Sequence, residues 1–229
     1  MNSLAILLAL MLSKGLHAPD TVPAIQSTSN FDIDGTGKAS AWEKASWMDL
    51  ERRKGSAPYQ TRVKLLYSDT GLYALYHCED KKITATFEED FANLWHEDVV
   101  EMFLWTDESV PLYFEYEISP LNYELPILVP NLSGRAYGWR PWHYEGARKT
   151  RHATHVTRDG QGQPTGWTAE FFIPWALLSP LQNVPPVKGT TWRINLYRID
   201  HDTGTTTWSW KPIEKNFHDF RLFGAIRFD

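Results

Sequence analysis

Hydrophobic and polar residues alternate along much of this chain with the period of two that β-strands show. Residues 113–118 are the clearest case, because alternation places Glu115 and Glu117 on one face and three apolar residues on the other. Residues 99–105 are mostly β-branched, aromatic or apolar, which is typical of a strand in a packed core. These patterns predict a protein built from strands.

The predicted strands occupy residues 62–67, 72–78, 99–105, 113–118, 152–158, 167–173, 192–199, 205–210 and 222–228. The polar residues 68–71 end in glycine and predict a hairpin between the first two. Residues 119–151 are rich in Pro, Asn, Gly, Trp and Arg, and we expect a long irregular excursion there. Residues 41–45 could form a short helix or an edge segment with Trp42 facing inward. About nine or ten strands with only short helical candidates predict an all-β fold. The expected architecture is an antiparallel β-sandwich, jelly-roll-like or of immunoglobulin type.

The N-terminus differs from the rest of the chain. Residues 4–12 are an apolar run that is too short to span a bilayer, and a small-residue context ends at Ala18. Residues 1–18 are therefore predicted to be a signal peptide of a secreted or periplasmic protein. The alternative is an apolar N-terminus of a cytosolic protein. Residues 19–30 are interpreted as a linker and residues 31–229 as a single domain.

Composition narrows the classes of function. The formal net charge is -5 and no basic run is present, which argues against a nucleic-acid partner. Cys78 is the only cysteine, so an intramolecular disulfide is excluded and a buried thiol is expected. The eight histidines lack a recognisable ligand spacing, so no zinc site is predicted. Aromatic residues reach 14%, and they suit both strands and platforms for flat ligands.

Glu101 is the first functional clue, because it interrupts the most apolar predicted strand. A carboxylate there is costly unless it has a partner or meets a ligand. Trp95 precedes the strand and could offer a face on which a flat ligand stacks, with Glu101 accepting hydrogen bonds from that ligand. The alternative is that Trp95 covers the core and Glu101 pairs with an arginine for structural reasons. The pattern alone leaves both interpretations open.

Glu115 and Glu117 would form a cluster of three carboxylates if their strand lies beside Glu101. Such a cluster requires compensation, either from Arg193 or Arg198 or from a cation. Calcium prefers oxygen ligands, so a structural calcium ion is a possible cofactor, although no EF-hand spacing is present. A solvated outer face is the alternative for Glu115 and Glu117.

Further candidates lie near the C-terminus and in the long excursion. Alternation places Asn195 on one face of residues 192–198 and Arg198 at the end of the opposite, core face, where it could turn towards Glu101. Trp208 and Trp210 share a face, and either could be a second stacking residue. Trp139 and Trp142 are alternatives, because exposed loop aromatics commonly bind ligands.

Several stretches together resemble family 9 carbohydrate-binding modules. The stretches are Asp34-Gly35 with Trp42 and Ala45, Leu72-Tyr73 before Glu79-Asp80, the motif Trp95-x-x-Asp98-x-Val100-Glu101, Gly166–Glu170 with Ile173-Pro174-Trp175, Trp192–Arg198, Trp208-Ser209, Phe217-His218 and Phe223-Gly224. Taken together, these stretches span residues 31–229. The resemblance implies a β-sandwich of the DOMON-like group and a non-catalytic carbohydrate-binding protein.

The resemblance also implies how a sugar would be held. Family members stack the ring between two tryptophans, meet its hydroxyls with Glu, Arg and Asn, and carry structural calcium. Residues expected at the site are Trp95, Glu101, Glu115, Glu117, Asn195, Arg198, Trp208 and Trp210. Glu115 and Glu117 stand where the family has Arg and Asn, so the ligand of this chain is left open. A separate glycan-degrading enzyme is a possible partner.

Two other functions remain as alternatives. A glycoside hydrolase would need a carboxyl pair at a defined separation, such as Glu101 with Asp98 or Glu117. A haem-binding sandwich would need axial ligands, usually His or Met, and Met102 and His77 are strand residues of these two types. No catalytic residue is predicted on the leading interpretation.

Overall fold

A computed structural model describes residues 22–138, 140–141, 145–179 and 181–229 of the 229-residue chain. The strands are β1 (Ala24–Ser27), β2 (Met48–Lys54), β3 (Thr61–Tyr67), β4 (Gly71–Glu79), β5 (Val99–Trp105), β6 (Leu112–Ile118), β7 (Glu124–Leu132), β8 (Arg135–Ala136), β9 (Arg140–Pro141), β10 (Arg151–Arg158), β11 (Pro164–Pro174), β12 (Thr191–Asp200), β13 (Thr206–Ser209) and β14 (Gly224–Phe228). The helical pieces are the 3-10 turns η1 (Ser40–Lys44), η2 (Leu94–His96), η3 (Gly146–Arg148) and η4 (Phe220–Leu222), with α1 (Trp175–Leu178).

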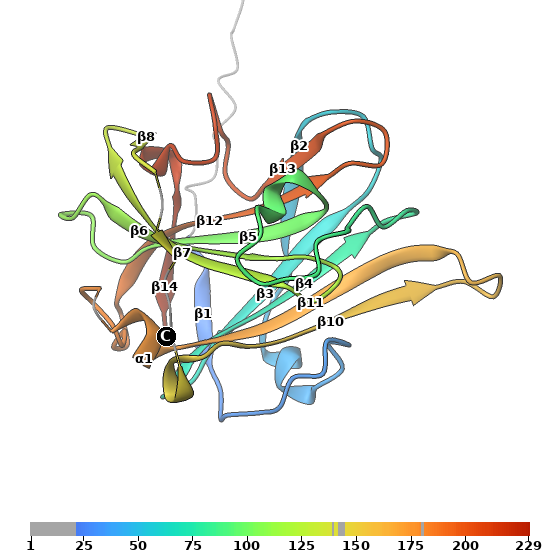
Figure 1. Ribbon diagram of the computed structural model, residues 1–229. Helices are drawn as coiled ribbons and strands as arrows, with labels where there is room; N and C mark the ends of the chain where they lie inside the picture. The colour runs from blue at the N-terminus through green and yellow to red at the C-terminus, as the bar shows by residue number, and fades with distance from the viewer. Residues whose placement is uncertain (1–21, 139, 142–144, 180) are drawn as a thin grey trace, which may run out of the picture.

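The strands form two layers, as Figure 1 shows. One layer has the order β10-β11-β4-β3, and the other has the order β14-β12-β5-β6-β7. Strand β1 joins them at one end by pairing in parallel with both β3 and β14. Strands β2 and β13 connect them at the other end. The predicted all-β sandwich is confirmed. The described residues contain more strands than the nine or ten expected, and β1 makes the sheet mixed rather than purely antiparallel.

The main hydrophobic core lies between the layers. Apolar residues of β3, β4 and β11 meet those of β5, β6 and β12 there, and the rings of Tyr116 and Phe171 approach to 4.6 Å across it. Cys78 is fully buried in this core, as predicted. Full burial of one Val, Leu, Ile, Phe or Met side chain in such a core stabilises a fold by about 1.5–3 kcal/mol. This core holds β5 and β6 in a fixed register.

A second hydrophobic cluster covers the opposite face of β5, β6, β7 and β12. It contains Val99, Phe103 and Tyr113 and extends to residues of η2 and η4 and to Phe223. Residues 213–223 and η2 therefore cover an outer face of the sandwich that alternation alone would leave in water. Glu101, Glu115 and Glu117 point to this face, because they alternate with residues of the main core. Glu101 thus lies outside the main core but is covered by the second hydrophobic cluster.

The hairpin of β3 and β4 is confirmed, and so is the short helical turn η1 with Trp42 facing inward. Residues 24–27 lie within the predicted linker but form β1, which pairs with two other strands. The expected irregular excursion is wrong for residues 124–132, which form β7 beside β6. Pro126 and Pro130 interrupt the strand pattern there, and β7 tolerates them because only short segments pair with its outer edge.

No helix within the described residues is long and apolar enough to cross a membrane. The predicted signal peptide, residues 1–18, lies outside the described residues.

Candidate functional site

The site begins with three glutamates on adjacent strands. The Cα atoms of Glu101 on β5 and Glu117 on β6 are paired across the sheet, and Phe103 is paired with Glu115 one step along. All three side chains are buried, with 3%, 3% and 1% exposure for Glu101, Glu115 and Glu117. The predicted carboxylate cluster is therefore present. The solvated outer face considered for Glu115 and Glu117 is wrong, since the second cluster covers that face.

The three carboxyls line a cavity of about 370 Å³. This volume lies within the range of small-molecule sites. The cavity is otherwise largely apolar, and its lining residues are Trp95, Glu101, Glu115, Glu117, Ile127, Val129, Ala136, Gly138, Ile199, Asn216, Phe217 and His218. Trp95 is half-buried at this cavity, so the motif from Trp95 to Glu101 does bring its two proposed binding residues together.

Trp95 is positioned by the residues that follow it. The Glu97 carboxylate accepts hydrogen bonds from the backbone N–H groups of Thr86, at 2.5 Å, and Phe87, at 3.1 Å. The Asp98 carboxylate accepts from the backbone of Thr84 at 2.6 Å and of His201 at 2.9 Å. These bonds fix the turn η2 at the start of β5. The backbone N–H of Trp95 itself donates to Glu117.

The loop from Asn216 to His218 covers the cavity and was not singled out as a binding element from the sequence. The Phe217 ring stacks on Tyr197 with centroids 4.1 Å apart, and the Tyr197 hydroxyl donates to the Phe217 carbonyl at 2.8 Å. His218 stacks on Phe103 and lies 2.5 Å from the Tyr113 hydroxyl through Nδ1. The only sequence signal was that Phe217-His218 matches a closing segment of the family pattern.

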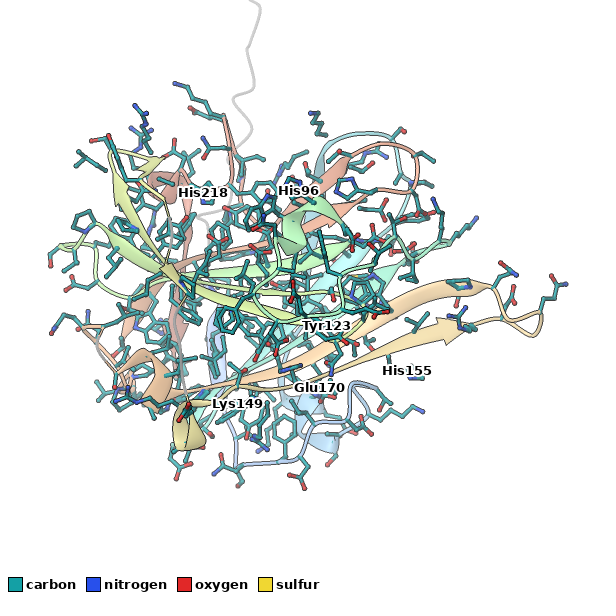
Figure 2. All side chains as sticks on the ribbon, in the orientation of Figure 1. His96, Tyr123, Lys149, His155, Glu170 and His218 are labelled. Carbon is teal, nitrogen blue, oxygen red and sulfur yellow. The ribbon has the colours of Figure 1, made fainter. Side chains whose placement is uncertain are left out.

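His218 brings a polar side chain close to the carboxyl cluster. Its Nδ1 lies 3.7 Å from Glu115 Oε2, and the Tyr113 hydroxyl donates to that same oxygen at 3.4 Å. Burial lowers the pKa of His218, so the ring is neutral at pH 7. In the view of Figure 2, His218 lies above the central strands and Glu170 below them.

Burial dominates the electrostatics of the three glutamates. It raises the pKa of Glu115 from its usual 4.5 to about 8. Burial and the charge of Glu115 raise the pKa of Glu101 well above its usual value. Burial and both neighbouring carboxylates do the same for the pKa of Glu117. The two neighbouring carboxyls affect each other in opposite directions, since Glu117 limits the rise of the Glu115 pKa and Glu115 adds to the rise of the Glu117 pKa. The site therefore holds protons at pH 7 that exposed glutamates would have lost.

The other predicted site residues do not line this cavity. The expectation that Arg198 turns towards Glu101 is wrong, because Tyr197 is the residue paired with Glu101 and Arg198 faces the other side of the sheet. There its fully buried guanidinium donates to Asp200 at 2.7 Å and to Asp80 at 3.0 Å. Arg198 therefore holds the sandwich together and does not contact the cavity.

Asn195, Trp208 and Trp210 also lie elsewhere. The Asn195 Oδ1 atom accepts from the backbone N–H of Lys211 at 2.9 Å, which fixes the turn after β13. Trp208 is buried in the main core and donates to the Tyr59 carbonyl at 3.2 Å. Trp210 is partly buried against the same core. Trp139 and Trp142, considered as second stacking residues, lie outside the described residues.

A group of aspartates is a second place in the described chain where three acidic side chains converge. One ligand oxygen from each of Asp80, Asp98 and Asp202 lies within 4.8 Å of the others. The Asp202 Oδ1 atom is buried without a hydrogen-bond partner, and its Oδ2 accepts from the Tyr59 hydroxyl at 2.7 Å. Burial raises the pKa of Asp80 and of Asp98 to about 7 each. Carboxylate oxygens, one of them without a partner, are the ligand type that calcium prefers.

A β-sandwich with one covered outer face has an aromatic, carboxyl-lined cavity under that cover, of the size that small-molecule sites have. The chain belongs to the carbohydrate family 9 binding domain-like family, whose model matches residues 33–229. No curated protein sequence matches the chain.

Solved structures share the fold at low identity. A family 9 carbohydrate-binding module from Caldicellulosiruptor kristjanssonii in complex with cellotriose has a TM-score of 0.66 and 17% identity, over 90% of this chain and 93% of that one. A family 9 carbohydrate-binding module from the same organism in complex with glucose has a TM-score of 0.65 and 15% identity, over 90% of this chain and 95% of that one. A candidate carbohydrate-binding protein from Bacteroides uniformis has a TM-score of 0.71 and 15% identity, over 91% and 100%.

Proposed function

We propose that this protein binds a sugar ring in the cavity beneath residues 216–218, with Trp95 as the stacking surface and Glu101, Glu115 and Glu117 as hydrogen-bonding groups. The observation that carries the proposal is the convergence of these four residues on one cavity in a chain of a carbohydrate-binding family. A sugar presents apolar faces and a rim of hydroxyls. The cavity offers the matching combination of aromatic walls and carboxyl oxygens.

One polar atom of the cavity lining supports this assignment. Glu117 Oε2 is buried and has no hydrogen-bond partner, although it lines the cavity. A buried polar atom without a partner is costly, and a ligand hydroxyl or amine placed there removes that cost. Two of the solved relatives of this fold hold cellotriose and glucose. These two sugars are therefore the first ligands to test.

The test is calorimetric titration of the protein with glucose, cellotriose and a panel of other mono- and oligosaccharides. Replacing Trp95 by alanine removes the stacking face, and one stacked ring contributes about 1 kcal/mol beyond its buried area. We expect the affinity of Trp95→Ala to fall at least about fivefold. Trp47→Ala is the matched control, because Trp47 is also half-buried but packs on Arg62 and His77 of the other layer. Equal sugar binding by wild type and Trp95→Ala would show that the site is elsewhere.

We propose that the binding is non-catalytic. A glycoside hydrolase needs one carboxyl that is protonated and a second that is ionised. Burial raises the pKa of Glu101, Glu115 and Glu117 alike, so the two roles are not separated. Turnover of chromogenic glycosides by the wild type, lost in Glu101→Gln, would overturn this proposal. For haem, Met102 is in the main core and His77 packs on Trp47, so these two residues share no cavity.

We further propose that calcium binds Asp80, Asp98 and Asp202 as a structural ion. In that place it would tie the end of β4, the start of β5 and the loop after β12 to one another. The test is thermal unfolding in calcium and in a chelator, because an ion that binds only the native state raises its stability. Asp202→Asn should abolish the difference. An unfolding temperature that does not change with calcium in the wild type would refute the site.

The predicted export and the predicted partner remain proposals. The apolar run and small-residue context of residues 1–18 support a secreted or periplasmic protein. A sugar-binding protein in that compartment would act beside a separate glycan-degrading enzyme. Mass spectrometry of the mature N-terminus tests the first point, and cleavage near Ala18 is the expected result.

A further inference from the structure

We infer that the preferred ligand is a sugar that carries a protonated amine, such as glucosamine or an oligosaccharide of it. The inference rests on the proposed function and names the ligand class of the same cavity. The cavity has three carboxyl groups, which is more than a neutral sugar needs.

The described lining of the cavity has three carboxyl groups and no lysine or arginine. The arginines that the sequence offered as compensation are engaged elsewhere. Arg198 is bonded to Asp80 and Asp200 on the other side of the sheet, and Arg193 donates to the carbonyl of Arg221. His218 is the remaining basic side chain of the lining, and burial lowers its pKa. The cluster therefore faces the ligand without a cation of its own.

Neutral hydroxyls do not need such a cluster. One ionised carboxyl accepts two or more hydrogen bonds from a sugar, whereas burial and the repulsion between ionised carboxyls keep this cluster protonated at pH 7. A ligand ammonium group changes this balance, because it donates three hydrogen bonds and offsets the repulsion. Hydrogen bonds between two charged groups are about twice as strong as neutral ones. Glu117 Oε2, buried without a partner, is an acceptor already in place for one of these bonds.

The rest of the cavity restricts which amine fits. Trp95, Phe217 and the apolar residues Ile127 and Val129 form walls suited to a ring with an apolar face. Within the described chain, the three-acid group whose ligand atoms lie within 4.8 Å of one another is that of Asp80, Asp98 and Asp202, and the glutamates are not part of it. A ring that bears a single ammonium group satisfies both the walls and the carboxyls.

Protonation makes the inference measurable. The groups that face the cluster are Glu101 of β5, Tyr113, Glu115 and Glu117 of β6, Tyr197 of β12 and His218 of the covering loop. Burial raises the pKa of both tyrosines and lowers that of His218, so these three are neutral at pH 7. The glutamates are then the groups that change charge. An ammonium ligand lowers their pKa values, so its binding releases protons to the buffer.

The experiment is calorimetric titration of the whole protein with glucose, glucosamine and N-acetylglucosamine at about pH 7, in two buffers of different ionisation enthalpy. Glucose and glucosamine differ at one ring carbon, where a hydroxyl replaces the amine. We expect glucosamine to bind at least about tenfold more tightly than glucose, which is about 1.4 kcal/mol. Proton release should accompany glucosamine only. N-acetylglucosamine, whose amine is acylated and uncharged, should lose the preference.

Glu117→Gln replaces the central carboxylate by a neutral group of the same shape, and its ratio of glucose to glucosamine dissociation constants should fall towards one. Glu108→Gln makes the same chemical change at an exposed turn and should keep the wild-type ratio. Glucose binding as tight as glucosamine binding would overturn the inference and leave the proposed function standing. Failure of every sugar to bind would overturn both. Equal binding of a simple alkylamine would show a cation site without sugar selectivity and would also overturn the inference.

Discussion

The Glu115→Gln variant tests the electrostatic account of the cavity most simply, because it asks whether the buried carboxyl destabilises the fold. Glu115 has 3% exposure, and burial raises its pKa from the usual 4.5 to about 8. Between these two values the unfolded chain has lost the proton while the native protein retains it. Each pH unit in that range costs the native state up to roughly 1.4 kcal/mol.

The sign follows from the raised pKa. The contribution of Glu115 to stability is fully present below about pH 4.5 and is lost as the pH rises to about 8. At pH 7 the accumulated cost is about 3 kcal/mol. Glutamine has no proton to lose, so Glu115→Gln should be more stable than wild type by up to that amount. For a chain of this size the unfolding temperature should rise by roughly 6–12 °C.

Urea unfolding of wild type and Glu115→Gln at about pH 4 and about pH 7 is the assay. The two proteins should have nearly equal free energies of unfolding at the lower pH and differ at the higher. Glu108→Gln, an exposed control, should change stability by no more than about 0.5 kcal/mol at either pH. A Glu115→Gln protein that is less stable than wild type at pH 7 would refute the reasoning. It would mean that the carboxylate makes a stabilising interaction within the native protein.

Three other predictions follow from the buried polar groups. Arg198→Met should lower the free energy of unfolding at pH 7 by about 3–5 kcal/mol, measured in urea, because Asp80 and Asp200 lose their buried partner; a neutral effect would contradict the role assigned to the pair. Glu170→Ala should lower it by at least about 2 kcal/mol, because this carboxylate accepts from three backbone N–H groups of residues 34–37 and from an indole; unchanged stability would be inconsistent with that network. Cys78, whose pKa burial raises to about 12, should react with a thiol reagent only after unfolding; rapid labelling of the native protein would show that the strand opens.

Strand alternation predicted the two faces of β5 and β6 correctly. Val100, Met102 and Leu104 do lie in the main core, and Glu101 and Glu115 do share the opposite face. These assignments depend only on the period of two, which every extended strand obeys. The predicted cluster of three carboxyls needed one further assumption, that β5 and β6 are neighbours. Their short connection makes that pairing natural.

The burial of the glutamates could not be predicted in the same way. Whether a sheet face meets solvent depends on segments far away in sequence, here residues 213–223 and η2. That covering segment has no regular pattern before it meets the sheet. Consequently Phe217 and His218 were not singled out as binding residues, although both line the cavity.

Arg198 shows a different limit. Its place on the core face of β12 was predicted, but its direction towards Glu101 was not borne out. Register decides whether two residues on neighbouring strands lie on the same side of the sheet. The register of β12 against β5 pairs Glu101 with Tyr197. One residue along, Arg198 therefore faces the opposite way. A single sequence carries no signal that fixes this register.

We propose that a sugar occupies the cavity between Trp95 and the three glutamates. A crystal structure of the protein soaked with the sugar that binds most tightly in titration would show where that sugar lies. We expect a ring against Trp95 with a polar group within hydrogen-bond distance of Glu117. A ring bound at any other surface, with this cavity unchanged, would contradict it.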